Sequence, residues 1–233
     1  MIHICLDTET TGLDPKQGHR IIEIAAIEMN NLVKTGKVFH CYLNPRRDVP
    51  IESFRIHNIS TEFLQDKPFF ADKAQEFLDF IQGSAIVAHN AQFDLRFINA
   101  ELELANLPKL GNPVVDTFLL AKKSFPGMPN SLDALCRRFA IDNSKRIAHG
   151  ALVDTELLCE VFVELMGGSQ NNFAFDDKKD QESFLLQNNS DKLRQKSQPK
   201  IDRQFSLTDE ELEAHRKFIL SNLKENIWNY PKE

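Results

Sequence analysis

Four acidic residues occupy positions where the neighbouring side chains predict buried faces of strands and helices. They stand in three short strings, Asp7-Thr-Glu9-Thr-Thr-Gly12, His89-Asn90-Ala-Gln-Phe-Asp94 and His149-Gly-Ala-Leu-Val-Asp154. A carboxylate is very costly to bury without a partner. A fold that buries all four acids must therefore pair them or supply a cation, which limits the architectures that this chain can adopt.

The first two acids, Asp7 and Glu9, are two residues apart at the end of an apolar strand-like segment. Side chains alternate along a strand, so both carboxylates point to the same face of a sheet. Two neighbouring carboxylates repel one another unless a cation lies between them. The alternative is a strand that runs out into a polar loop, where Asp7 or Thr8 serves the turn.

Asp94 lies on the apolar stripe of a predicted helix, because Phe97, Ile98 and Leu102 follow it at helical spacing. The alternative is an acid of the first helical turn, favoured there by the helix dipole, with Asn90 as the N-cap.

Asp154 repeats this pattern with Leu158, Val161 and Leu165. His149 precedes it in a predicted loop, from which the imidazole can reach whatever Asp154 binds. A histidine is a suitable general base because its reference pKa lies near 6.5. The alternative for His149 is an ordinary surface residue.

The order of predicted elements indicates an α/β fold. Three early strands are followed by alternating helices and strands, which favours a mixed sheet flanked by helices. The predicted strands cover residues 2–6, 21–28, 37–43, 85–88 and 114–115. The predicted helices cover residues 71–81, 91–104, a segment around Ala121, 131–139 and 150–166.

Composition changes near Gly167, where a polar stretch begins that is too poor in aliphatic residues to bury a core. Residues 170–175 form a short aromatic island within it. Farther on, Thr208-Asp-Glu-Glu211 fits a capping box and predicts a helix with Leu212, His215, Ile219 and Leu223 at helical spacing.

The net charge of −6 argues against a general nucleic-acid binder, although bound cations would offset acidic ligands. The four cysteines show no metal-binding or disulfide pattern, so we expect free thiols in a cytoplasmic protein. Apolar runs of transmembrane length are absent from the sequence, and Asp7 comes too early for a signal peptide.

Carboxylate oxygens suit hard cations such as Mg²⁺ or Mn²⁺ better than Zn²⁺. Two such ions about 3.5–4 Å apart can activate a water and stabilise the leaving oxygen of a phosphodiester. The four acids and His149 therefore predict a two-metal hydrolase.

The same strings, together with Gly18-His-Arg-Ile-Ile-Glu-Ile-Ala25 and Ile141-Asp-Asn-Ser-Lys-Arg146, resemble a known family. The chain is similar to DEDD-type 3′→5′ exonucleases with a histidine in the third motif (DEDDh), most closely the epsilon proofreading subunits of bacterial DNA polymerase III. The resemblance covers residues 2–166. It implies an RNase H-like fold with a five-stranded mixed sheet.

The resemblance also implies roles for individual residues. Asp7, Glu9 and Asp154 match direct metal ligands, Asp94 matches the fourth acid, and His149 matches the general base. Glu52 and His57 match residues that contact the terminal nucleotide, whereas the sequence by itself favours a solvated loop for both. Asp116, before Thr117, is predicted to be a helix cap rather than a ligand.

The implied organisation is an exonuclease domain at 1–166, a flexible linker at 167–200 and a polymerase-binding tail at 201–233 that contains Trp228. The implied partners are a single-stranded 3′ end of DNA, the polymerase alpha subunit, the sliding clamp through residues 170–175, and a small accessory subunit. Two alternatives remain open: a related exoribonuclease that acts on short RNA or tRNA ends, and a scaffold subunit without activity.

Overall fold

A computed structural model describes residues 1–144, 146, 148–167 and 208–222. The chain divides into two units, Met1–Phe173 and Ala174–Glu233, and each is described by itself. The predicted linker at 167–200, the aromatic island at 170–175 and Trp228 lie wholly or almost wholly outside the described residues. The predicted division at 1–166, 167–200 and 201–233 therefore stays a prediction.

The first unit is built on a five-stranded mixed sheet, which confirms the predicted fold class. The strand order is β3-β2-β1-β4-β5; β1 pairs antiparallel with β2, β2 antiparallel with β3, and β4 lies parallel to both β1 and β5. The strands are β1 Ile2–Thr10, β2 Ile21–Asn30, β3 Val33–Tyr42, β4 Ala85–Ala88 and β5 Val114–Asp116.

Four of the five strands are longer than predicted, β1 and β3 by the most. β1 continues to Thr10, so Asp7 and Glu9 lie within the strand and not just beyond it. β3 begins at Val33 because Asn31 and Leu32, with φ of 48° and 66°, make a two-residue turn. Such turns with two positive φ values match the twist of a hairpin, so pairing starts at once.

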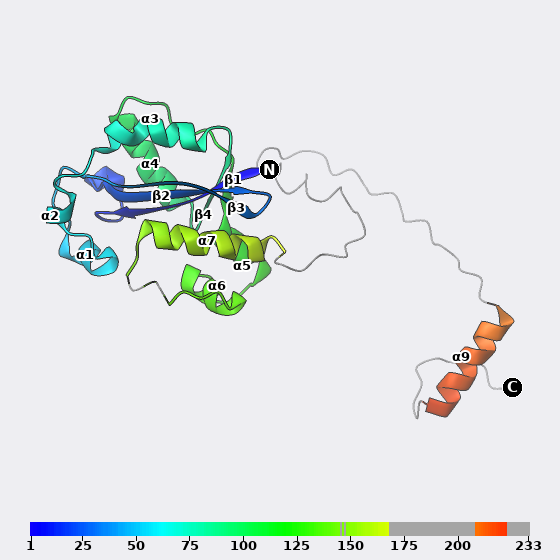
Figure 1. The fold of residues 1–233 in the computed structure, drawn as a ribbon. Coiled ribbons are helices and arrows are strands. Elements are labelled where there is room, and N and C mark those ends of the chain that lie inside the picture. Colours follow the sequence, from blue (N-terminus) through cyan, green and yellow to red (C-terminus); the bar gives the residue numbers. More distant parts are fainter. Residues whose placement is uncertain (145, 147, 168–207, 223–233) are drawn as a thin grey trace. The chain divides into compact units, whose positions relative to one another are not determined.

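Helices cover both faces of the sheet (Figure 1). α3 and α4 lie on one side, and α5, α6 and α7 lie on the other. The helices are α1 Ile51–His57, α2 Thr61–Leu64, α3 Phe70–Ile81, α4 Gln92–Leu104, α5 Thr117–Ser124, α6 Leu132–Phe139 and α7 Ala151–Leu165, with a short 3-10 turn η1 at Pro15–Gln17.

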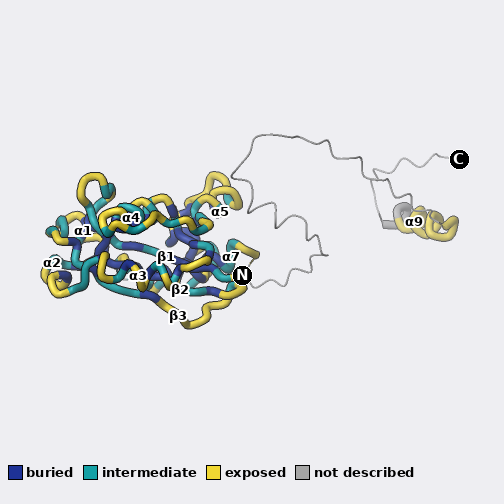
Figure 2. The backbone as a smooth tube through the Cα atoms, turned by 90° about the horizontal axis from the view of Figure 1, so that it is seen from above, coloured by how far each residue is buried: buried dark blue, intermediate teal, exposed yellow. Residues whose placement is uncertain are grey.

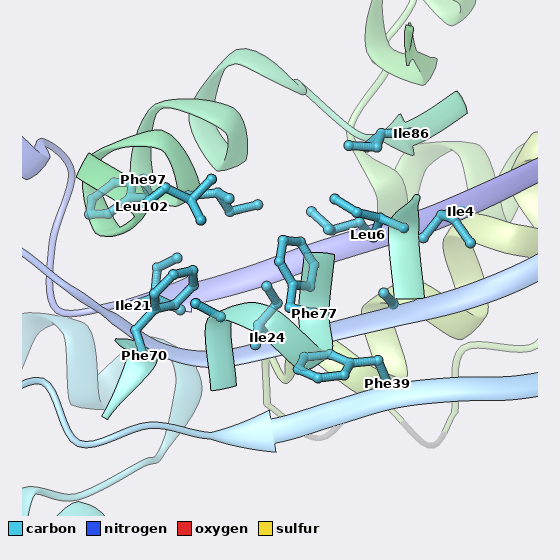
Figure 3. Packing of buried hydrophobic residues seen from close by; sticks show 14 of the residues in the cluster. Ile4, Leu6, Ile21, Ile24, Phe39, Phe70, Phe77, Ile86, Phe97 and Leu102 are labelled. Atoms are coloured by element: carbon cyan, nitrogen blue, oxygen red, sulfur yellow. The ribbon is translucent and has the colours of Figure 1, made fainter. Parts of the chain in front are cut away.

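Alternation along β1 separates the two larger of the three clusters of the core. Ile4 and Leu6 pack with Phe77 and Phe97 of α3 and α4, as Figure 3 shows, while Cys5 packs with the α7 cluster. Buried residues accordingly run along the central strands in Figure 2, and exposed residues gather on the outer helices and loops. Asp7 and Glu9 share the face of Cys5 and therefore look toward α7.

In the second unit the structure describes one helix, α9 Asp209–Asn222. The predicted capping box is confirmed, because the Glu211 carboxylate accepts from the Thr208 N–H at 2.9 Å and Thr208 Oγ1 accepts from the Glu211 N–H at 3.3 Å. Of the predicted apolar stripe, Leu212 is 42% exposed, whereas the side chains of Ile219 and Leu223 lie outside the description.

All four cysteines are free, as expected. Among the described residues, no helix combines the length and the apolar character that a membrane span requires.

Candidate active site

The sheet and α7 bring three of the predicted site residues together. Glu9 on β1, Asp154 in the first turn of α7 and His149 in the loop before α7 each offer a ligand atom, and these atoms lie within 4.8 Å of one another. Asp7 joins His149 and Asp154 in the lining of a pocket of about 460 Å³. This is an arrangement in which a cation could be held by several oxygens.

Asp94 reaches the site from the other side of β1. It is 3% exposed at the start of α4, and Thr8 Oγ1 donates a hydrogen bond of 2.7 Å to its Oδ1. Thr8 alternates with Asp7, so this contact lies on the α4 face of the strand. The predicted buried position of Asp94 is confirmed, but its nearest partner is the Thr8 hydroxyl.

The carboxyl groups of the site lose their protons less readily than usual because they are buried beside one another. Burial, and then the charges of Asp94, Glu9 and Asp154, raise the pKa of Asp7 well above its usual range. Burial and the charge of Asp154 raise the pKa of Glu9 to about 8, and burial raises that of Asp94 to about 7. A divalent cation would relieve this repulsion, so the donor set fits such an ion.

Arg146 is a site residue that sequence reasoning did not assign, although it stands in the string that gave the resemblance its specificity. Its Nη2 donates to Asp154 Oδ2 at 2.7 Å, and its Nη1 donates to Asp133 Oδ1 at 2.8 Å. Its Nη2 also lies 2.7 Å from His149 Nδ1. The same His149 Nδ1 also lies 3.3 Å from Asp154 Oδ2, so the imidazole, the guanidinium and the carboxylate form one cluster. A cation on Asp154 would compete with Arg146 for the same oxygens.

Glu23 was also missed, and it fixes the start of α7. Its side chain is buried, and its Oε2 accepts from the Ala151 N–H at 3.0 Å while Oε1 lies 2.8 Å from His40 Nε2. Because Glu23 pairs with Glu9 across β1 and β2, one carboxylate ties the catalytic strand to the helix that carries Asp154. The sequence does contain a signal for Glu23, because it is an acidic residue within the otherwise apolar run of β2.

The segment with Glu52 and His57 is helix α1, so the expectation of a solvated loop was wrong. Glu52 is exposed, but His57 is buried, and its Nδ1 accepts from the Ile59 N–H at 3.0 Å. Within the described chain, His57 Nε2 has no hydrogen-bond partner. The His149 N–H donates to the Ile56 carbonyl at 3.1 Å, which holds α1 against the His149 loop.

Two further residues considered in the sequence analysis, Asp116 and His89, form hydrogen bonds or close polar contacts within the fold. Asp116 is the N-cap of α5, as predicted, since its carboxylate accepts from the Phe118 and Leu119 N–H groups. His89 lines the pocket beside Asp7; its Nδ1 lies 3.0 Å from Thr117 Oγ1, and its buried Nε2 lacks a partner among the described residues.

Comparison with known proteins explains this arrangement. A family model described as exonuclease (RNase_T) matches residues 4–162. The chain is 50% identical over 226 residues to the DNA polymerase III subunit epsilon of Rickettsia felis, covering 95% of this chain and 96% of that protein. It is 45% identical to the Escherichia coli K12 protein of the same name, covering 91% and 89%.

The chain belongs to this exonuclease family. Solved structures agree: exonuclease X in complex with 5′ overhanging duplex DNA superimposes with a TM-score of 0.57 at 26% identity, covering 70% of this chain and 90% of that one. The nuclease domain of 3′hExo, a DEDDh family member bound to rAMP, shares the fold with a TM-score of 0.60 at 16% identity, over 71% and 91% of the two chains.

Membership settles the class of chemistry. The chain is a 3′→5′ exonuclease, and its fold implies dependence on a divalent metal. The cluster of Glu9, His149 and Asp154 is consistent with that dependence.

Proposed function

We propose that this exonuclease removes nucleotides from the 3′ end of DNA as the proofreading subunit of a bacterial DNA polymerase III, releasing 5′-mononucleotides. The observation that carries the proposal is the convergence of Glu9, Asp154 and His149 beside Asp7 in one pocket. The near-complete overlap with relatives named as epsilon subunits supports the role in replication.

In this proposal Asp7, Glu9 and Asp154 bind two divalent cations, Mg²⁺ or Mn²⁺, and Asp94 is the fourth acid. The cations supply Lewis-acid activation of a water and charge stabilisation at the scissile phosphate. The raised pKa values of Asp7, Glu9 and Asp94 support this assignment, because cation binding would return each carboxyl to its ionised form.

The remaining residues of the proposed site transfer a proton or position the substrate. His149 accepts the proton of the attacking water, for which its 49% side-chain exposure is suited. Glu52 and His57 contact the terminal nucleotide, and the unpartnered Nε2 of His57 is a polar atom that a nucleotide could satisfy. Asp133 holds Arg146 and so limits where the guanidinium can move.

The partners in this proposal are a single-stranded 3′ end, the polymerase alpha subunit, the sliding clamp and a small accessory subunit, in the cytoplasm. The clamp contact would use residues 170–175 and the polymerase contact residues 201–233, which include α9. Tethering to the polymerase would supply the effective concentration that an acidic protein needs near DNA.

The two alternatives have less support. An exoribonuclease would share the pocket, but the relatives that match nearly the whole chain carry the name of a DNA polymerase subunit. An inactive scaffold is disfavoured because Asp7, Glu9, Asp94, His149 and Asp154 are all present in the sequence, and ligand atoms of Glu9, His149 and Asp154 lie within 4.8 Å of one another.

Asp7→Asn tests the metal-site assignment with little change of shape. It should abolish Mg²⁺-dependent hydrolysis of a 3′-mismatched primer, with a loss of at least about 10³-fold, because one ligand is lost. The exposed Asp66→Asn is the matched control and should retain full activity. Undiminished hydrolysis by Asp7→Asn would end the assignment, and a matched RNA primer tests the RNA alternative.

A further inference from the structure

Basic side chains border a hollow on the side of the molecule where η1 and α4 meet. The hollow has a volume of about 360 Å³. Its charged lining consists of Lys16, His19, Arg20, Arg46, Arg47 and Glu101. This concentration of positive charge is a local departure from a chain whose net charge is −6.

Two adjoining hollows extend the first into a groove, called the basic groove below. One shares Lys16 and Leu104 with it and continues along α4 to Arg96 and Lys109. The other shares Arg20 with it and ends at Phe69. The basic groove is therefore long enough to follow more than one charged group of an extended ligand.

Two of the three acids in the basic groove form ion pairs with basic neighbours. Arg20 forms a two-pronged pair with Glu101, at 2.7 Å and 2.6 Å. Glu103 lies 3.4 Å from Lys109 Nζ. Asp14 caps η1 by accepting from the Lys16 backbone N–H at 3.0 Å. The lining of the three hollows thus holds six lysines and arginines against these three acids, so its net charge is positive.

The rim is held in place before any ligand arrives. The guanidinium of Arg46 lies 3.8 Å from the centroid of the Phe69 ring, and its backbone N–H donates to Asn44 Oδ1 at 2.9 Å. Arg47 Nη1 donates to the Gly18 carbonyl. Such contacts lower the entropy cost of fixing a long side chain on a ligand.

The basic groove shares helix α4 with the candidate active site. Gln92 and Arg96, which line it, are each two residues from Asp94 on α4 and therefore lie on another face of the helix than that buried carboxylate. At the other end, the His19 ring lies against Gly12, so closely that a Cβ there would be 2.3 Å from it. Gly12 closes the string that carries Asp7 and Glu9, so the basic groove meets the loop that follows the catalytic strand β1.

We propose that the basic groove binds phosphates of the nucleic-acid substrate other than the scissile one. Arginine forks match phosphate oxygens, and such contacts position a strand without reading its sequence. An acidic peptide could meet the same charges, but the substrate of a nuclease is a polyanion, and the basic groove adjoins the loop that follows the strand carrying Asp7 and Glu9. The inference rests on the proposed function and deepens it.

The test uses the full chain with Mg²⁺ and the double variant Lys16→Gln/Arg46→Gln. Three substrates are compared: a dinucleotide, a single strand of about 20 nucleotides and a 3′-mismatched primer–template. KM for at least one long substrate should rise roughly tenfold. Where that substrate is the single strand, the slope of log KM against log salt should also fall by about 1.4, because two phosphate contacts are lost. Hydrolysis of the dinucleotide should be unchanged.

Two further variants keep the test decisive. Arg96→Gln, which removes one cation from the α4 side of the basic groove, should raise the same KM by a smaller factor. Lys37→Gln/Lys73→Gln removes equal charge from exposed ion pairs elsewhere and should have no effect. An effect on the single strand places the cleaved strand in the basic groove, and an effect on the primer–template alone places the second strand there.

Unchanged KM on both long substrates would overturn the inference, as would an equal loss in the control. A slower dinucleotide reaction would also overturn it, because the variant would then act through the pocket. Failure of the wild-type protein to cleave any of the three substrates would instead refute the proposed function.

Discussion

At the scale of single residues, the site consists of carboxyl groups that the fold keeps close together although their negative charges repel one another. Asp7 and Glu9 lie side by side on β1, and Asp154 faces them from α7. Their shared burial raises the pKa of Asp7 and Glu9, so the folded protein without metal favours protons there. Part of the folding free energy is therefore spent on preparing a place for cations.

This charge balance predicts how stability depends on pH. The pKa of Glu9 rises from its ordinary value of 4.5 to about 8, so within that window the folded chain holds a proton that the unfolded chain has released. Stability without metal should therefore fall as pH rises, by about 1–3 kcal/mol between pH 5.5 and pH 8. Urea unfolding with a chelator present measures this change.

Glu9→Gln should flatten that dependence, while Glu156→Gln, an exposed change on α7, should leave it as in the wild type. Mg²⁺ should stabilise the wild-type protein more at pH 8 than at pH 5.5, since its ligands must be ionised. Equal slopes for wild type and Glu9→Gln would show that another group controls the pH dependence.

At the scale of elements, the position of α7 decides whether the site forms. The helix begins at Ala151, whose N–H donates a hydrogen bond to the buried Glu23 carboxylate of β2. Thr155 adds a hydrogen bond of 2.7 Å from its hydroxyl to the Ala151 carbonyl. The first turn of α7, which carries Asp154, is thus fixed by a residue on a different element.

Glu23→Ala should loosen this junction. It leaves the Ala151 N–H and His40 without their acceptor, which should cost about 1–3 kcal/mol in unfolding free energy. The turnover rate on a single-stranded oligonucleotide should fall by roughly tenfold or more, because Asp154 loses its fixed position. Glu23→Gln keeps an acceptor oxygen and should recover most of the turnover rate; equal rates in Glu23→Ala and wild type would contradict this role.

At the scale of the whole molecule, an acidic chain must act on a polyanion. The basic groove would provide local affinity, and the proposed contact of the second unit with the polymerase would provide proximity. These two contributions belong to different parts of the chain and are separable by experiment.

Truncation after Met166 separates them. The shortened protein keeps the sheet and all of α7, so it should hydrolyse a free oligonucleotide within about twofold of the full chain. It should lose binding to the polymerase alpha subunit in a pull-down. Retained binding would assign the polymerase contact to the first unit, and lost hydrolysis would show that the residues beyond Met166 complete the nuclease.

Local patterns were sufficient for the elements with strong periodicity. The stripe of Phe97, Ile98 and Leu102 located α4 and the buried face of Asp94, and the capping box located the start of α9. The segment of α1 and α2 was not predicted as helical. Both helices are short, and short helices depend more on tertiary packing than on their own propensity.

The sequence by itself determined the alternation of strands and helices, the buried faces that carry the acids, and the family to which the chain belongs, because periodicity and motifs are written in neighbouring residues. Only the tertiary structure decided that Glu23 holds Ala151, that Arg146 bridges Asp133 and Asp154, and that Thr8 holds Asp94. These contacts join residues on separate elements. Their geometry follows from how the sheet and helices pack, which no local pattern contains.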